Sequence, residues 1–147
     1  MQIKSRLELG GLMRHLQLPM VAVECGVAEG RWSESLMDMG MEKLYLIDIW
    51  ETVPFLDGCA SREQEWHDSN YESVKSKFKD KPKVILLKGF SYKMAAEIPD
   101  NSVGMVYIDA NHEYLGAYSD AEIFWEKLVK NGILAFHDAA NPEYGVW

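Results

Sequence analysis

The sequence predicts an α/β fold in which a doubly wound parallel sheet is covered by helices on both faces. Five short apolar runs recur along the chain, at residues 20–25, 43–49, 83–87, 103–108 and 132–136. Each run is nearly continuous rather than alternating with polar residues, as expected for a parallel strand that is buried on both faces. Segments with helical periodicity separate the runs, and this alternation of strand and helix is typical of a doubly wound sheet.

The helices are predicted from apolar residues that recur at spacings of three and four. These residues are Trp32 and Leu36; Tyr71, Val74 and Phe78; Met94, Ala95 and Ile98; and Tyr118, Ala121, Trp125 and Leu128. Gly40, Pro82 and the pair Asn131 and Gly132 mark boundaries between elements. Residues 1–19, which end at Pro19, are predicted to form an amphipathic helix.

Several side chains in the predicted helices are expected to have structural rather than ligand-binding roles. We expect Trp66, Trp125 and Tyr118 to belong to the core rather than to a ligand platform. We expect His67, like His15 in the amino-terminal segment, to lie at the surface because charged residues surround it. The segment from Glu51 to Lys81 is a long excursion that begins as a loop and continues as a charged helix.

Length and composition indicate one globular domain, with residues 1–19 as a helical segment and residues 20–139 as the α/β core. The chain has 147 residues, of which 48% are hydrophobic, and its formal charge is −8. Such an acidic balance argues against nucleic acid as a partner.

The two cysteines, Cys25 and Cys59, form no disulfide framework or metal motif, which favours a reducing, cytoplasmic setting. No stretch approaches the roughly 20 apolar residues of a membrane span.

A turn with two glycines follows the first predicted strand, where doubly wound folds bind nucleotides. Gly26 and Gly30 enclose this turn, and a helix follows it. Tight packing of strand against helix would explain the same glycines. Asp48 strengthens the functional interpretation, because it ends the second strand, 22 positions after Gly26, where a carboxylate can accept the hydroxyls of a ribose.

The ligand at this turn is predicted to be cationic. A dinucleotide fingerprint has three glycines, and its middle glycine is missing here, which disfavours a pyrophosphate. Glu24 and Glu29 flank the turn, and their charges would repel phosphates but suit a sulfonium with an α-amino group. S-adenosylmethionine fits this description.

Five segments in order carry a family resemblance: residues 23–30, 46–50, 88–91, 107–114 and 132–138. Together they resemble class I S-adenosylmethionine-dependent methyltransferases, and more narrowly the branch that includes small-molecule and sugar O-methyltransferases. In that branch an Asp-x-x-His-x-Tyr stretch follows the fourth strand and a His-Asp pair ends the fifth; here these are Asp109, His112 and Tyr114, then His137 and Asp138. The resemblance covers most of the chain, from Val21 to Asp138.

The resemblance implies a set of cofactor-binding residues. Glu24, Gly26 and Gly30 would surround the methionine part, Asp48 would bind the ribose, and Ile49 or Trp50 would flank the adenine. Gly89, Phe90 and Ser91 would line the adenine pocket, and Asp109 matches the acid that follows the fourth strand in this family. One departure, Cys25 in place of an aliphatic residue, is a small apolar change.

The resemblance also implies the strand order 3-2-1-4-5. Complete members continue to a sixth and a seventh strand, whereas this sequence stops soon after the fifth. The fifth strand would then form an apolar edge, which we expect further strands or a second copy in a homodimer to cover.

For catalysis, the resemblance suggests methyl transfer to a small-molecule acceptor, with oxygen favoured over nitrogen. His112 would act as the general base and Asp109 would orient the acceptor. Asp109, His137 and Asp138 are candidate ligands for Mg²⁺ or another divalent cation. Purely structural roles stay open: His112 and Asp109 could support a turn, and His137 and Asp138 could be a solvated strand end. A cofactor-binding but catalytically silent subunit and, less favoured, an NAD-linked oxidoreductase are the alternative functions.

Overall fold

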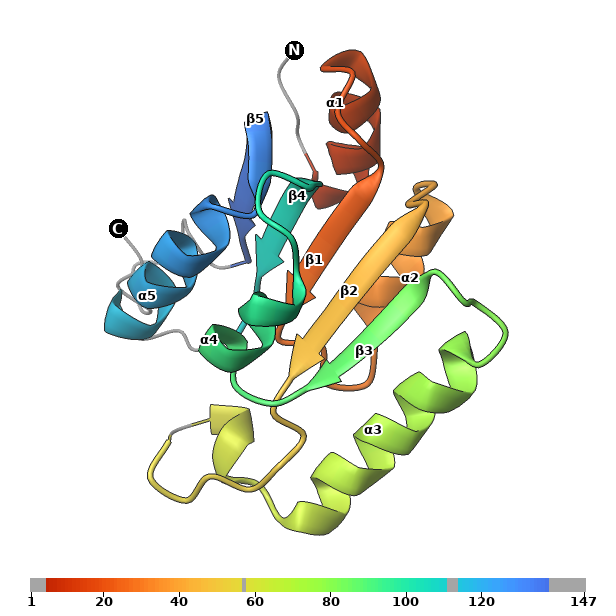
Figure 1. Cartoon of the computed structure of the whole chain (residues 1–147). Helices are drawn as coiled ribbons and strands as arrows, with labels where there is room; N and C mark the ends of the chain where they lie inside the picture. The colour runs from red at the N-terminus through yellow and green to blue at the C-terminus, as the bar shows by residue number, and fades with distance from the viewer. Residues whose placement is uncertain (1–4, 57, 111–113, 138–147) are drawn as a thin grey trace.

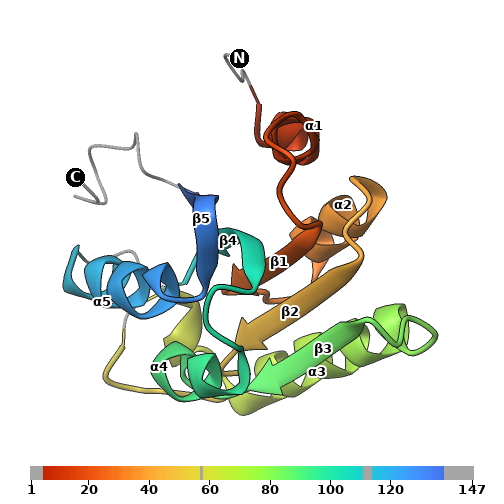
Figure 2. The ribbon, with the colours of Figure 1, turned by 45° about the horizontal axis from the view of Figure 1, so that its top comes forward.

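The computed structural model describes residues 5–56, 58–110 and 114–137. Its centre is a parallel sheet in the order β3-β2-β1-β4-β5, which confirms the predicted fold class and strand order. Figure 2 shows the strands in this order, with the sheet twisted from one edge to the other. The strands are β1 (Val21–Cys25), β2 (Lys43–Asp48), β3 (Val84–Lys88), β4 (Val103–Ile108) and β5 (Leu128–Phe136).

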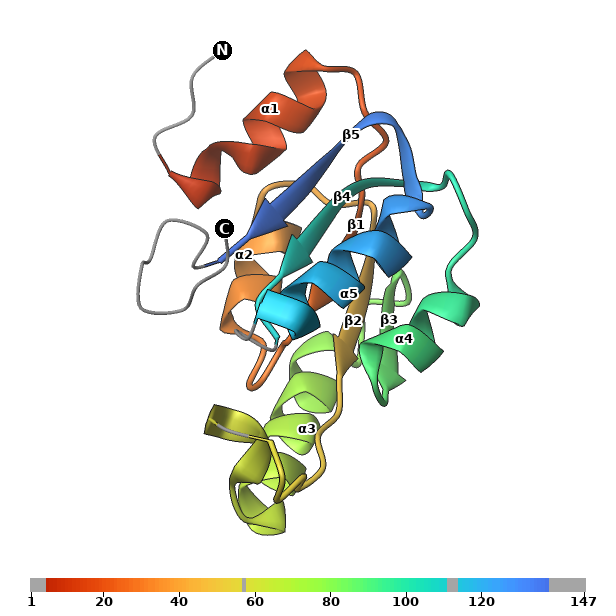
Figure 3. The same ribbon diagram turned by 90° about the vertical axis from the view of Figure 1, so that its left-hand side faces the viewer.

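Helices cover both faces of the sheet, with α4 in front of it and α2 behind it in Figure 1. The α-helices are α1 (Leu9–His15), α2 (Arg31–Asp38), α3 (Gln64–Phe78), α4 (Ser91–Met94) and α5 (Tyr114–Trp125). Short 3-10 segments lie at η1 (Arg6–Glu8), η2 (Gly58–Ser61) and η3 (Ala95–Glu97). Side chains of α1, α2 and α3 form one core cluster with the sheet, and Ala95, Ile98 and Phe124 belong to the other. Figure 3 shows α1 and α2 on one side of β4 and β5, and α5 on the other.

The fifth strand begins earlier than the sequence predicted. β5 starts at Leu128, which pairs with Val103, and the register then shifts before Ile133 pairs with Met105. Asn131 has a φ of 65°, so the pair Asn131 and Gly132 forms an irregularity within β5 rather than the boundary before it. The predicted boundary is therefore wrong: Asn131 and Gly132 interrupt a strand instead of separating it from the helix before it.

The buried face of α5 also differs from the expectation. Tyr118 is 50% exposed and Trp125 is 68% exposed, whereas Ala117, Asp120 and Phe124 are buried. Apolar residues occur on both faces of this helix, so periodicity alone selected the wrong one. The expectation for His67 is wrong as well, because it is only 2% exposed on α3. Trp66 is half-buried and His15 is exposed.

The strand ends bring the predicted site residues to one edge of the sheet. Residues that follow the strands continue the hydrogen-bond ladder: the Gly26 amide donates to Ile47, Gly89 to Asp48, Asp109 to Cys25 and His137 to Ile108. All the strands run parallel, so these four residues meet at the carboxyl edge, where ligands bind in doubly wound folds.

Within the described ranges, no helix has the length and apolar character needed to cross a bilayer.

The burial pattern of α5 predicts that substitution of two adjacent aromatic residues changes the free energy of unfolding by very different amounts. Phe124 is fully buried, so Phe124→Ala should lower the free energy of unfolding by about 3–5 kcal/mol. Trp125→Ala, its exposed neighbour, should change that energy by less than about 0.5 kcal/mol. Urea denaturation of both variants checks this. A larger loss for Trp125→Ala would show that the face named by periodicity is the buried one.

Candidate functional site

Asp48 braces the glycine turn that follows β1. Its Oδ2 atom accepts the backbone N–H groups of Val27 and Ala28, both at 2.8 Å, and its Oδ1 accepts the N–H of Trp50 at 3.1 Å. A carboxylate offers about four acceptor positions, so roughly one remains for a ligand hydroxyl. Asp48, which is predicted to bind the ribose, therefore also determines the shape of the turn.

Gly26 is required by the protein's own backbone. A Cβ atom at this position would lie 2.0 Å from the carbonyl oxygen of Asp109, and the φ of Gly26 is +89°. Gly30, with a φ of +79°, ends the turn as the N-cap of α2, and its Cβ would lie 3.1 Å from Val74 of α3. Both glycines thus place the turn tightly between the loop after β4 and the helix layer.

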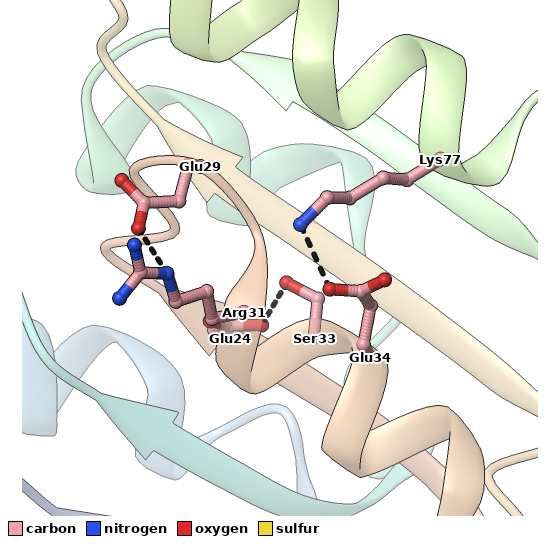
Figure 4. A network of polar contacts seen from close by, with 6 residues as sticks. All are labelled: Glu24, Glu29, Arg31, Ser33, Glu34 and Lys77. Carbon is pink, nitrogen blue, oxygen red and sulfur yellow. Dashed lines mark hydrogen bonds and ion pairs between the residues drawn. The ribbon is translucent and has the colours of Figure 1, made fainter.

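Glu24 lies beneath this turn as a buried acid. It is 1% exposed, and the hydroxyl of Ser33 on α2 donates a hydrogen bond to its Oε2 at 2.5 Å, as Figure 4 shows. Burial raises the pKa of Glu24 to about 8; the bond from Ser33 opposes this shift, and the negative charges of Asp109 and Asp48 add to it. A cation arriving beside Glu24 would therefore stabilise its charged form.

Glu29, the second acid of the turn, has a cationic partner. Figure 4 shows its carboxylate paired with Arg31. The two charged groups lie 2.5 Å apart, and the Arg31 side chain is 85% exposed. The same figure shows Lys77 of α3 paired with Glu34 of α2, which joins the two helices behind the turn. The charge of Glu29 is thus partly balanced, and the buried Glu24 is the stronger reason for the turn to favour a cation.

An apolar pocket of about 240 Å³ opens beside the turn at the ends of β2 and β3. Of the residues predicted to line an adenine site, Ile49, Gly89 and Phe90 line this pocket. Its other lining residues come from the loop after β2: Glu51, Thr52, Val53, Pro54 and Phe55.

Trp50, the alternative to Ile49, does not line this pocket. It is fully buried, packs against Tyr71 with the ring centroids 5.0 Å apart, and donates its indole N–H to the carbonyl of Ala28. Its φ of 40° turns the chain two residues after Asp48, and Ile49, between the two, lines the pocket.

Ser91, at the start of α4, links the segment after β3 to the neighbouring helix α5. Its hydroxyl donates a hydrogen bond to Asp120 of α5 at 2.5 Å, and the thiol of Cys25 donates to the same carboxylate at 3.8 Å. Burial raises the pKa of Asp120 and raises that of Cys25 well above its usual value. Ser91 therefore holds the loop after β3 in place through a buried polar cluster that the sequence did not reveal.

Two of the residues predicted for catalysis or metal binding are brought together at the ends of β4 and β5. The Nδ1 atom of His137 lies 3.4 Å from a carboxylate oxygen of Asp109. The predicted base, His112, and the third candidate metal ligand, Asp138, lie outside the described residues. Within the described residues, no group of three His, Cys, Asp or Glu side chains could hold a metal ion.

Three residues that the sequence did not assign to the site lie beside Glu24. The guanidinium of Arg6 lies 4.3 Å from the ring centroid of Trp32 and donates a hydrogen bond to the hydroxyl of Tyr107 at 3.1 Å. Arg6 and Tyr107 are 101 positions apart, so no local spacing could have joined them.

The site can bind a ligand with a positive charge and an apolar, planar part. The buried carboxylate of Glu24 and the carboxylates of Asp48 and Asp109 favour the charge, and the pocket of Ile49 and Phe90 suits the planar part. These residues fit S-adenosylmethionine, which combines a sulfonium and an ammonium with an adenosine. Fold and site together therefore define a Rossmann-like domain suited to an adenosine cofactor.

A family model described as a methyltransferase domain matches residues 23–139. The chain belongs to this family, which confirms the resemblance found in the sequence.

Solved structures agree on the fold. The chain resembles a candidate caffeoyl-CoA O-methyltransferase from Staphylococcus aureus at 17% identity and a TM-score of 0.65, covering 94% of this chain and 60% of that one. It resembles CalS11, a TDP-rhamnose 3'-O-methyltransferase of calicheamicin biosynthesis, at 20% identity and a TM-score of 0.62, covering 95% and 65%. The SAH-bound methyltransferase PaMTH1 from Podospora anserina matches at 16% identity and a TM-score of 0.60, covering 93% and 54%. This chain thus spans less than two thirds of each of these proteins. No curated protein sequence matches it.

The raised pKa of Glu24 predicts how stability depends on pH. Between about pH 4.5 and 8 the folded protein holds a proton that the unfolded chain has lost, so the free energy of unfolding should fall as pH rises through this window. The slope can reach about 1.4 kcal/mol per pH unit. Glu24→Gln keeps an acceptor for Ser33 but cannot ionise, so this contribution should vanish. Urea denaturation from pH 5 to 8 tests it, and equal slopes for the two proteins would contradict it.

Proposed function

We propose that this chain transfers a methyl group from S-adenosylmethionine to a hydroxyl oxygen of a small molecule. The observation that carries the proposal is the buried carboxylate of Glu24 beneath a turn that Asp48 braces, with an apolar pocket beside it. Membership of the methyltransferase-domain family supports the same chemistry. The choice of oxygen is supported by the sequence pattern of the O-methyltransferase branch and by neighbours named as O-methyltransferases.

Different residues of the site would contact different parts of the cofactor. Ile49, Gly89 and Phe90 would hold the adenine, and the remaining acceptor position of Asp48 would take a ribose hydroxyl. Glu24 and Asp109 would face the ammonium group. Because Glu24 is largely protonated below pH 8, binding of the cation would release a proton and should strengthen as pH rises toward 8.

The cofactor supplies a methyl group already activated on a sulfonium, so the protein has to align an acceptor and remove its proton. Asp109 lies at the carboxyl edge next to His137 and is the proposed orienting residue. His112 is the proposed base, and a divalent cation on Asp109, His137 and Asp138 remains a prediction. Such a cation would lower the pKa of the acceptor hydroxyl.

The first test concerns cofactor binding. Asp48→Asn leaves one acceptor oxygen for three backbone donors and a ribose, so the affinity for S-adenosylmethionine and S-adenosylhomocysteine should fall at least about tenfold. Titration calorimetry measures it. Asp100→Asn, at a partly exposed acid paired with Lys127 before β4, is the matched control and should bind as the wild type does. If wild-type protein binds NADH but neither S-adenosylmethionine nor S-adenosylhomocysteine, the methyltransferase proposal is wrong and the NAD-linked alternative is favoured.

The second test concerns proton removal. His112→Ala should reduce turnover by about 10²–10⁴-fold while cofactor affinity stays nearly the same. Transfer of a radiolabelled methyl group to a panel of phenols, sugars and sugar nucleotides identifies an acceptor and gives the rate. Unchanged turnover in His112→Ala would exclude the proposed base. Full activity in excess EDTA would exclude the metal, and cofactor binding with no transfer across the panel would favour the catalytically silent subunit.

A further inference from the structure

Arg6 is an exposed residue, but its guanidinium is held in a defined position at the site. Its guanidinium lies over the ring of Trp32 and donates one hydrogen bond to Tyr107. These two rings pack against each other, with centroids 5.1 Å apart, and both are buried. A guanidinium has five N–H donors, so the bond to Tyr107 leaves most of them available to a ligand.

Further donors without acceptors lie next to Arg6. The indole N–H of Trp32, on the ring that carries the guanidinium, is buried and has no hydrogen-bond partner within the described residues. Trp32 belongs to the first turn of α2, and the N-cap of this helix, Gly30, contributes no side-chain cap. The first amides of a helix lack intrahelical acceptors, and the helix dipole favours an anion there. The free donors of Arg6, the indole N–H of Trp32 and the first amides of α2 are therefore available to an anionic group of a ligand.

Both negatively and positively charged side chains lie around the turn. Glu24 experiences the negative charges of Asp109 and Asp48 and the opposing positive charge of Arg6. An α-amino acid is a zwitterion at neutral pH, so a site for it needs an acidic group and a basic group close together. The amino-acid part of the proposed cofactor has this pattern; Arg31 beside the turn is already paired with Glu29, and Arg6 supplies a positive charge near Glu24.

We propose that Arg6, held between Trp32 and Tyr107, binds the α-carboxylate of S-adenosylmethionine. This inference rests on the proposed function and assigns a role to the segment before the sheet. Glu24 and Arg6 would then bind the two charged groups of one amino-acid moiety, and the protein would select a nucleoside that retains its carboxylate.

The test compares two ligands that differ only in that carboxylate. Titration calorimetry gives the affinities of wild-type protein for S-adenosylmethionine and for decarboxylated S-adenosylmethionine. A charged hydrogen bond is strong enough that Arg6→Ala should weaken S-adenosylmethionine about tenfold or more. Binding of the decarboxylated ligand should change less than about twofold, which also shows that the variant is folded.

Two further variants refine the result. Tyr107→Phe keeps the ring but removes the hydroxyl that fixes the guanidinium, so it should show a smaller loss for the carboxylated ligand alone. Arg14→Ala is the matched control, because Arg14 lies in the same amino-terminal segment but binds the carbonyl of Met39. It should bind both ligands as the wild type does.

Two outcomes would overturn the assignment while leaving the proposed function intact. If Arg6→Ala weakens both ligands equally, Arg6 only supports the fold of the site. If it weakens neither but lowers turnover with an anionic acceptor, the guanidinium binds the acceptor instead. Wild-type protein that binds neither nucleoside would refute the proposed function as well.

Discussion

The hydrogen bonds from the turn to Asp48 are the constraint on which the rest of the site depends. One carboxylate oxygen accepts two consecutive amides, those of Val27 and Ala28, and thereby ties the end of β2 to the turn after β1. Ala28 has a φ of 49°, a strained value for a residue with a side chain, and these bonds offset its cost. The turn is therefore shaped before any ligand arrives.

The turn packs closely against the loop after β4, so the position of the turn also fixes that loop. Gly26 touches the backbone of Asp109 so closely that no side chain could fit between them. The Asp109 amide in turn bonds to Cys25, so the loop after β4 follows the turn after β1. Backbone contacts thus help to position Asp109 relative to Asp48.

Buried acids on the two sides of the sheet have different roles. On the α2 side, Glu24 accepts a hydrogen bond from Ser33 and has a raised pKa, so it would lose its proton when a cation binds beside it. On the α5 side, Asp120 accepts from Ser91 and Cys25 and holds the loop that lines the pocket. Burial raises the pKa of both acids, although the positive charge of Arg6 partly opposes the shift at Glu24, and acids with raised pKa values cluster at functional sites.

Local patterns predicted the repeating elements well because a buried parallel strand needs a continuous apolar run, and such a run is visible in the sequence. They failed on α5, where apolar residues on both faces made the buried side ambiguous, and at Asn131, where a turn signal marks an irregularity within a strand. Both failures occur where the outcome depends on what the segment packs against rather than on the segment itself.

The fold class could be predicted from the apolar runs, and the family resemblance added the strand order and placed Glu24, Gly26, Asp48 and Asp109 at the carboxyl edge. Three features became visible only in the folded chain: Asp48 braces the turn, Ile49 rather than Trp50 lines the pocket, and Arg6 reaches Trp32 and Tyr107. The reason is physical. Strand periodicity and turn chemistry act between near neighbours, whereas burial, pKa and hydrogen-bond partners depend on contacts between segments far apart in the chain.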